Sequence, residues 1–334
     1  MKYQTLMRGL VASFVTLAAI LATTAQTPYR ISSPYTYKNL SIFLIHGKDA
    51  STKDNVITLQ EAMERKLFRV YETGDVNELE VENVSKTLDV FIQSGDIVKG
   101  GKQDRILGVS IIVPARSGRI SIEAFCVESG RWEKRGGEDS KQFTSSNDRI
   151  VTKELKLAAN ASRSQQDVWS QVSEAQERLA KNVGGSVRGD SESSLQLSLE
   201  NRRVVTNVDE YVRNLSGVIN GKSDVIGYAF AVNGQINSAD VYVSNALFKK
   251  LWAKMLRASA TEAVAAQRGV RLAEPVKADA VKTFIADAEK PRPTDSTASA
   301  GARVRKREDK DNVMIEAVDD RTKMSVHKSY VKKN

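Results

Sequence analysis

The chain has 334 residues, a formal net charge of +9 at pH 7, one cysteine and two histidines. A single cysteine excludes an intramolecular disulfide, and so few cysteines and histidines argue against a metal site. The densest basic run, Arg303–Lys310, is interrupted by acids and has no accompanying series of aromatic side chains. This pattern is typical of a solvated strand face, so we do not expect a nucleic-acid partner.

Residues 1–25 have the pattern of a secretory signal peptide. Lys2 and Arg8 make a basic start, Leu10–Ala22 is an uncharged apolar run, and small residues continue to Ala25. The apolar run is shorter than the roughly 20 residues of a membrane-spanning helix. We therefore expect an exported protein, periplasmic or secreted, with cleavage near Ala25 and no membrane attachment afterwards. An uncleaved membrane anchor is the alternative.

Residues 26–334 have the pattern of a single α+β domain, with strands early, helices in the middle and strands late. Leu40–His46 is predicted as a strand, and Thr58-Leu59-Gln60-Glu61 is a capping box that opens a short helix. From Leu67 to Ala124 the apolar residues recur with a period of two between glycine, asparagine and proline turns. Short connections between such strands favour a mostly antiparallel sheet.

The second half of the chain contains several segments with apolar residues three and four positions apart, which predicts packed amphipathic helices. The predicted helices are Ser164–Val183, Val204–Leu215, a helix capped by Ser244 that runs through Leu256, and Ala278–Ala288. Asn233-Gly234 predicts a hairpin turn between two strands. The Pro-, Ser- and Thr-rich stretch at about 290–301 reads as a mobile linker, and 302–331 as a β-meander that completes the main sheet.

The stretch from Gly95 to Trp132 is the best candidate for a functional site. Adjacent glycines let successive backbone amides point at an anion, and neighbouring basic side chains add charge. The candidate ligand-binding residues are Gly100, Gly101, Lys102, Gln103, Arg105, Glu128, Arg131 and Trp132. The spacing is not that of a Walker loop or a dinucleotide fingerprint, and a solvated basic hairpin loop is the alternative.

Glu128, Arg131 and Trp132 flank a Ser-Gly turn. They form either an ion pair across the turn covered by the indole, or the polar rim of a pocket in which Trp132 stacks on a ring. Cys126 lies on a strand face with apolar neighbours, which predicts an interior thiol with a raised pKa. A catalytic role for Cys126 would need a base such as His46 or His327 nearby.

Asp240 lies on the return strand of the predicted hairpin, among Ala239, Val241 and Tyr242. A carboxylate there is either solvated or, paired with Glu128 or Asp104, available for acid/base chemistry. The two histidines are interpreted as structural or surface residues. The candidate catalytic residues are therefore Glu128, Asp240 and Cys126, and we expect neither a metal nor another cofactor.

Five segments of the chain together carry a family resemblance. They are Gly100–Arg105, Cys126–Trp132, Ile226–Gly234, Ala239–Tyr242 and Leu247–Trp252. The chain resembles the ARG- and rhodanese-phosphatase-superfamily-associated protein domain family over roughly Tyr37–Ala266, with the closing strand His327–Val331. The resemblance implies an α+β domain without an established activity. The family's name records genomic association with ADP-ribosylglycohydrolase and phosphatase-type neighbours, which points to ADP-ribose or nucleotide metabolism.

Three functions remain open from the sequence. The first is a binding module for a small anionic or sugar-nucleotide ligand, with Lys102 and Arg105 on the anion and Trp132 on a ring. The second is a hydrolase acting on a nucleotide or ADP-ribose-like substrate, with Glu128 or Asp240 as general base. The third is an envelope structural or interaction protein without catalytic chemistry, whose protein partner the sequence does not indicate.

Overall fold

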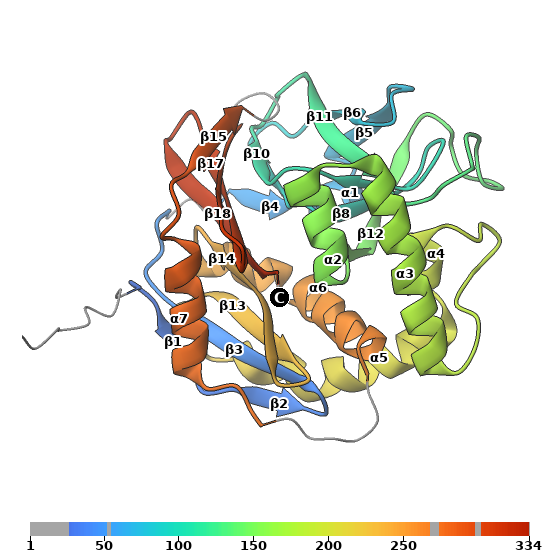
Figure 1. Cartoon of the computed structure of the whole chain (residues 1–334). Coiled ribbons are helices and arrows are strands. Elements are labelled where there is room, and N and C mark those ends of the chain that lie inside the picture. The colour runs from blue at the N-terminus through green and yellow to red at the C-terminus, as the bar shows by residue number, and fades with distance from the viewer. Residues whose placement is uncertain (1–26, 52–54, 268–273, 298–301, 334) are drawn as a thin grey trace, which may run out of the picture.

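The computed structural model describes residues 27–51, 55–267, 274–297 and 302–333, so the predicted signal peptide lies outside the described residues. These ranges form three β-sheets with helices packed around them (Figure 1). All strand pairs are antiparallel except one, in which the strands Val56–Thr58 and Asp89–Ile92 run parallel. The predicted α+β class with mostly antiparallel sheet is confirmed.

The nine-stranded sheet joins the two ends of the chain, in the order β1-β3-β13-β14-β18-β17-β16-β15 with β2 paired to β3. Its strands are β1 (Arg30–Ile31), β2 (Tyr35–Tyr37), β3 (Leu40–His46), β13 (Val225–Val232), β14 (Gln235–Tyr242), β15 (Thr294–Thr297), β16 (Ala302–Glu308), β17 (Asn312–Asp319) and β18 (Met324–Lys332). The closing meander therefore completes the main sheet, as predicted.

The two smaller sheets are built from the chain between these ends. The three-stranded sheet has the order β10-β7-β4, and the six-stranded sheet has the order β12-β8-β9-β11-β6-β5. Their strands are β4 (Val56–Thr58), β5 (Phe68–Glu72), β6 (Glu78–Asn83), β7 (Asp89–Ile92), β8 (Asp96–Gly100), β9 (Arg105–Leu107), β10 (Ile111–Val113), β11 (Arg119–Cys126) and β12 (Phe143–Arg149). The chain crosses from one small sheet to the other between β7 and β8 and returns between β9 and β10.

The helices cover the sheets with apolar faces. They are α1 (Leu59–Glu64), α2 (Lys153–Leu157), the π-helical turn η1 (Ala158–Ser162), α3 (Gln165–Val183), α4 (Leu195–Leu199), α5 (Arg202–Leu215), the 3-10 turn η2 (Ser216–Ile219), α6 (Asn245–Ala265) and α7 (Ala278–Ala288). Helices α6 and α7 lie on opposite faces of the nine-stranded sheet (Figure 1). Alternation in β3 explains this, because Ile42 and Leu44 belong to the apolar cluster of α6, and Phe43 and Ile45 to that of α7.

Local capping and turn signals form as predicted. Ser164 and Ser244 accept N–H groups at the starts of α3 and α6, and the capping box opens α1. Asn233 and Gly234 both have positive φ, at 52° and 73°, as a two-residue hairpin turn requires. Such signals depend on a few neighbouring residues, and for that reason a sequence reveals them.

Part of the segment interpreted as a mobile linker forms a strand. Thr294–Thr297 forms the edge strand β15, paired with β16. Opposite charges across the pair hold it, because Asp295 lies opposite Arg305 with 3.0 Å between a carboxylate oxygen and Nε. Residues 298–301 lie outside the described residues.

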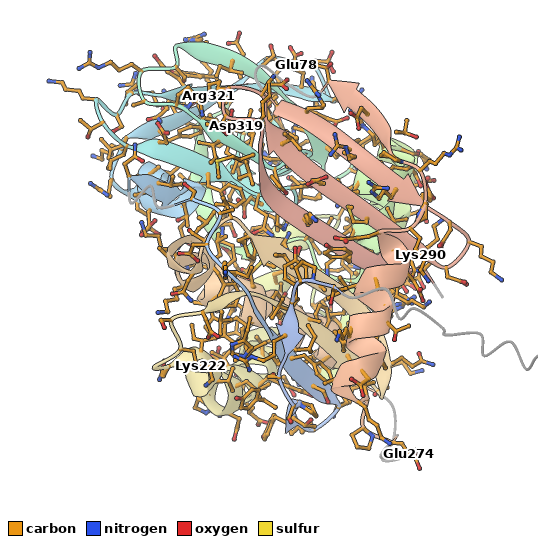
Figure 2. All side chains as sticks on the ribbon, turned by 90° about the vertical axis from the view of Figure 1, so that its left-hand side faces the viewer. Glu78, Lys222, Glu274, Lys290, Asp319 and Arg321 are labelled. Atoms are coloured by element: carbon orange, nitrogen blue, oxygen red, sulfur yellow. The ribbon has the colours of Figure 1, made fainter. Side chains whose placement is uncertain are left out.

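The turn between β17 and β18 is fixed by one carboxylate. Asp319 accepts the backbone N–H of Arg321 at 2.8 Å and its guanidinium at 2.9 Å. Figure 2 shows the two side chains beside each other at this turn. Within the described residues, no helix is both long and apolar enough to cross a membrane.

Candidate functional site

The Gly100-Gly101 loop, which joins β8 and β9, has its amides bonded within the chain. The N–H of Gly100 donates to Asp104 Oδ1 at 3.0 Å, and the N–H of Lys102 donates to Glu72 Oε2 at 3.2 Å. The N–H of Gly101 donates to the backbone carbonyls of Asp139 and Gln142 at 3.1 and 3.2 Å. A side chain at Gly101 would collide with the ring of Phe143, because its Cβ would lie 2.3 Å from a ring carbon. The glycine pair therefore serves a tight turn, and acidic side chains occupy two of the positions that an anion would take.

Asp104 and Glu128 are the centre of a buried charged network, which we call the acid–arginine cluster. Both carboxylates have no exposed surface. Glu128 binds Arg131 through two bonds of 2.7 and 2.6 Å, and Asp104 binds Arg135 at 2.9 and 3.1 Å. The N–H of Asp104 also donates to Glu128 at 3.0 Å, and Ser191 donates its hydroxyl to the same carboxylate. These bonds satisfy Glu128 on both oxygens.

The pKa values of the acid–arginine cluster reflect these bonds. Burial raises the pKa of Glu128, but the hydrogen bonds from Arg131 and Ser191 outweigh it, so the pKa lies below its ordinary value. Burial lowers the pKa of Arg135, and the bonds and charges of Asp104 and Glu138 outweigh it and raise the pKa. Glu128 and Arg135 are therefore both held in their charged forms.

Trp132 lies against the basic side chains of Lys102 and Arg105. Its ring lies 5.6 Å from the guanidinium carbon of Arg105 and 4.9 Å from Lys102 Nζ. Arg105 is fully buried and pairs with Glu72 at 3.3 Å. Trp132 is the exposed large apolar side chain among the described residues, with 43% of its surface exposed. The ligand-binding role predicted for this stretch stays a prediction.

Cys126 is a free, fully buried thiol. Its Sγ lies 3.7 Å from the carbonyl oxygen of Val76, and burial raises its pKa to about 11 although Arg105 opposes the shift. A thiol with that pKa is hardly ionised at neutral pH and is a poor nucleophile. The prediction of an interior thiol agrees with this environment.

Asp240 lies in a different place, on β14, and its partner is His327 of the neighbouring strand β18. The carboxylate oxygen Oδ1 is 3.0 Å from His327 Nε2, and both side chains are buried. The other ring nitrogen, Nδ1, is 2.9 Å from the hydroxyl oxygen of Ser110. Ser110, His327 and Asp240 thus form a continuous hydrogen-bonded chain, which we call the Ser–His–Asp relay.

The ionisation state of Asp240 decides which ring nitrogen of His327 carries a proton. Burial raises the pKa of Asp240, but the hydrogen bond and charge of His327 and the charges of Arg149 and Lys156 outweigh it and leave the pKa below its ordinary value. An ionised Asp240 only accepts, so Nε2 carries a proton. When the imidazole is neutral, Nδ1 is the acceptor and the Ser110 hydroxyl donates to it; when the ring is protonated, Nδ1 donates to Ser110 instead.

Neighbouring elements fix the position of each member of the relay. The imidazole of His327 stacks on Tyr242, its cross-strand partner, with ring centroids 4.8 Å apart. Ser110 lies where the chain returns from β9 to β10, and Ser94 lies at the opposite crossing, between β7 and β8. The N–H of Ser94 donates to the Ser110 hydroxyl oxygen at 3.0 Å. The relay therefore sits where the three sheets meet.

The relay lines a polar cavity of about 50 Å³, large enough for a few water molecules or for one small group of a larger ligand. Arg149, Lys156 and Asn160 also line it, and the exposed Arg163 lies at its rim. Asn160 is in the π-helical turn, and the helix before it, α2, is capped by Thr152, whose φ of 63° is rare for a residue with a side chain. Both features are frequent at functional sites.

A larger, mostly apolar cavity of about 280 Å³ lies between the start of α6 and the β17–β18 turn. The basic side chains that line it already bond to other groups of the protein. Lys250 donates to the carbonyl of Val56 at 2.7 Å, and Arg321 pairs with Asp319. The relay is therefore the better candidate for chemistry.

The structure brings together only some of the candidate catalytic residues and bases that were predicted from the sequence. Glu128 lies beyond the end of β11 in the acid–arginine cluster, whereas Asp240 belongs to the nine-stranded sheet, so they do not form an acid/base pair. His46 pairs with Asp224 at 2.8 Å, away from the relay. Ser110 was not predicted at all. Two features of the sequence could have pointed to Ser110 and His327. One is the short connection Gly108-Val109-Ser110 between two predicted strands, and the other is that the chain has only two histidines.

Fold and site together define an α+β protein with a buried Ser–His–Asp relay on a polar cavity. No group of three or more His, Cys, Asp or Glu side chains that could hold a metal occurs in the described part of the chain. The chain belongs to the ARG and Rhodanese-Phosphatase-superfamily-associated Protein domain family, whose model matches residues 28–331. No curated protein and no solved structure matches the chain.

Proposed function

We propose that the protein is a hydrolase that uses Ser110 as nucleophile, His327 as general base and Asp240 to hold the imidazole in place. The observation that carries the proposal is the Ser–His–Asp relay, with distances of 2.9 and 3.0 Å on the wall of a cavity. A hydroxyl bonded to a base that is itself oriented by a third group is the arrangement that activates a serine.

The proposed reaction is ester hydrolysis in two steps. Ser110 Oγ attacks the carbonyl carbon while His327 Nδ1 takes the hydroxyl proton and then gives it to the leaving alcohol. Water then attacks the acyl-enzyme, gives a proton to His327, and the acid is released with the Ser110 hydroxyl restored. The imidazole faces serine with Nδ1 and the acid with Nε2, and either nitrogen serves as base when the other holds the proton.

A fluorophosphonate probe tests the proposal, because an activated serine forms a P–O bond with it and releases fluoride. We expect one adduct on the mature chain, located at Ser110 by peptide mass spectrometry, and none after Ser110→Ala or His327→Gln. Ser329→Ala is the matched control, since Ser329 lines the same cavity without belonging to the relay. Labelling that survives Ser110→Ala, or no labelling of a folded wild-type chain, would refute the proposed function.

Three predictions from the sequence stand as proposals beside this one. The first is export after cleavage near Ala25. The second is binding of a small anionic or sugar-nucleotide ligand by the Gly100–Trp132 stretch, which the exposed face of Trp132 supports. The third is a nucleotide or ADP-ribose-like substrate. Binding of ADP-ribose by the wild type and not by Trp132→Ala, followed by calorimetry, would support the second and third together.

A further inference from the structure

Arg149 is a buried cation without a carboxylate partner. Only 4% of its surface is exposed. Its Nη2 donates to the carbonyl oxygen of Ser94 at 2.7 Å, while Nε is buried and has no hydrogen-bond partner. Among the described residues, no carboxylate lies within ion-pair distance of its guanidinium. The carboxylate of Asp240 acts on it only from farther away, and is already bonded to His327.

The other cations of the same cavity have partners. Lys156 Nζ pairs with Glu262 at 3.4 Å and contacts the Ser238 hydroxyl at 3.2 Å. Arg163 at the rim pairs with Glu123 through bonds from Nε and Nη2. A buried charge that lacks a counter-ion is costly, so proteins keep one chiefly where a ligand supplies the opposite charge.

The chain places this guanidinium next to the proposed nucleophile. Arg149 holds the carbonyl of Ser94, and the N–H of Ser94 holds the hydroxyl of Ser110, so one residue links the two. Gly95 makes room for the arrangement, because a Cβ there would lie 2.1 Å from Ile150 and 3.4 Å from Arg149 Nη2. Arg149 and Ser110 line the same cavity.

We propose that Arg149 binds an anionic group of the substrate, a carboxylate or a phosphate, while Ser110 attacks the bond beside it. This assignment of substrate class rests on the proposed function. The guanidinium of Arg149 lines the cavity with one hydrogen bond to the protein, a planar guanidinium suits the paired oxygens of either anion, and a cavity of about 50 Å³ has room for one such group. Neutral esters would leave Arg149 without a counter-charge.

Calorimetric titration with inorganic phosphate and with acetate at low salt tests the site and separates the two anions. The wild type and Ser110→Ala should bind the same anion at one site with equal Kd, because the serine is not needed for the charge contact. Arg149→Met should raise Kd by about tenfold or more, the loss of a charge-assisted hydrogen bond. Arg163→Met is the matched control and should change Kd by less than about twofold.

A second measurement applies if Arg149→Met does not fold. Arg149→Lys keeps the positive charge on the cavity wall but loses the planar pair of donors, so it should still bind the favoured anion with Kd raised about threefold or more, whereas Arg163→Lys should leave Kd unchanged. Absence of binding by both anions, or binding whose Kd does not depend on Arg149, would overturn the assignment. Serine labelling without anion binding would refute the anion site alone, whereas anion binding without serine labelling would refute the hydrolase alone.

Discussion

Replacing Glu128 with Gln should destabilise the protein by about 3 kcal/mol. The carboxylate is fully buried and accepts two bonds from Arg131 and one from the N–H of Asp104. Removing one member of a buried ion pair typically costs about 3–5 kcal/mol, because the other charge stays behind. Here Arg131 keeps weaker bonds to the carbonyls of Gly100 and Gly101, which places the expected cost at the lower end.

Urea unfolding followed by tryptophan fluorescence measures this cost, since Trp132 directly follows Arg131 in the chain. The control is Arg30→Gln, which breaks a pair with Asp224 in which both side chains are more than half exposed, and should cost less than about 1 kcal/mol. The pKa of Glu128 is lowered by folding, so its contribution is present above the unfolded value of ~4.3 and is lost as the pH falls through the folded value. The difference between wild type and Glu128→Gln should therefore shrink below about pH 4. A cost similar to that of Arg30→Gln at pH 7 would refute the structural role.

Three further changes test single positions. Cys126→Ser should lower the free energy of unfolding by about 1–3 kcal/mol, measured in urea, because it buries a hydroxyl. At pH 8 the native Cys126 thiol should react with iodoacetamide far more slowly than the thiol of the unfolded chain, because its pKa is about 11. Equal reaction rates would contradict this. Gly95→Ala should lower the free energy of unfolding by at least about 2 kcal/mol, because φ is +87° and the added Cβ would clash with Ile150. Gly137→Ala is the control and should be nearly neutral, because there is open space around Gly137. Similar melting temperatures for the two variants would be inconsistent with a strained turn at Gly95. Ser244→Ala should cost about 1 kcal/mol through loss of the α6 cap, and an unchanged unfolding midpoint would show that the cap contributes nothing.

Local structure was largely predictable because its causes lie close together in the chain. The period-two pattern predicted the strands, and Ser164, Ser244 and Asn233-Gly234 predicted helix starts and a turn. The edge strand β15 was missed because its stability comes from pairing with β16 and from the Asp295–Arg305 contact, neither of which a Pro- and Ser-rich composition reveals.

The candidate site was predictable only in part, for a different reason. The Gly100-Gly101 loop has the anion-facing amides expected of it, but folding brings Asp104 and Glu72 to them. The relay depends on register, because His327 reaches Asp240 only when β18 pairs with β14. No short motif marks such a meeting, and a step such as Gly108-Val109-Ser110 between two strands is too common to single out the serine.

Ser110 and His327 lie 217 positions apart, which decides how late in synthesis and folding the site can form. The proposed nucleophile and the carboxylate Asp240 are both synthesised well before the base, which arrives with the last strand of the described residues. Closing so long a loop is entropically costly and is achieved only when β18 docks against β14. Under the proposed function, partly synthesised chains that lack β18 would be inert, and activity would report that this strand is in place.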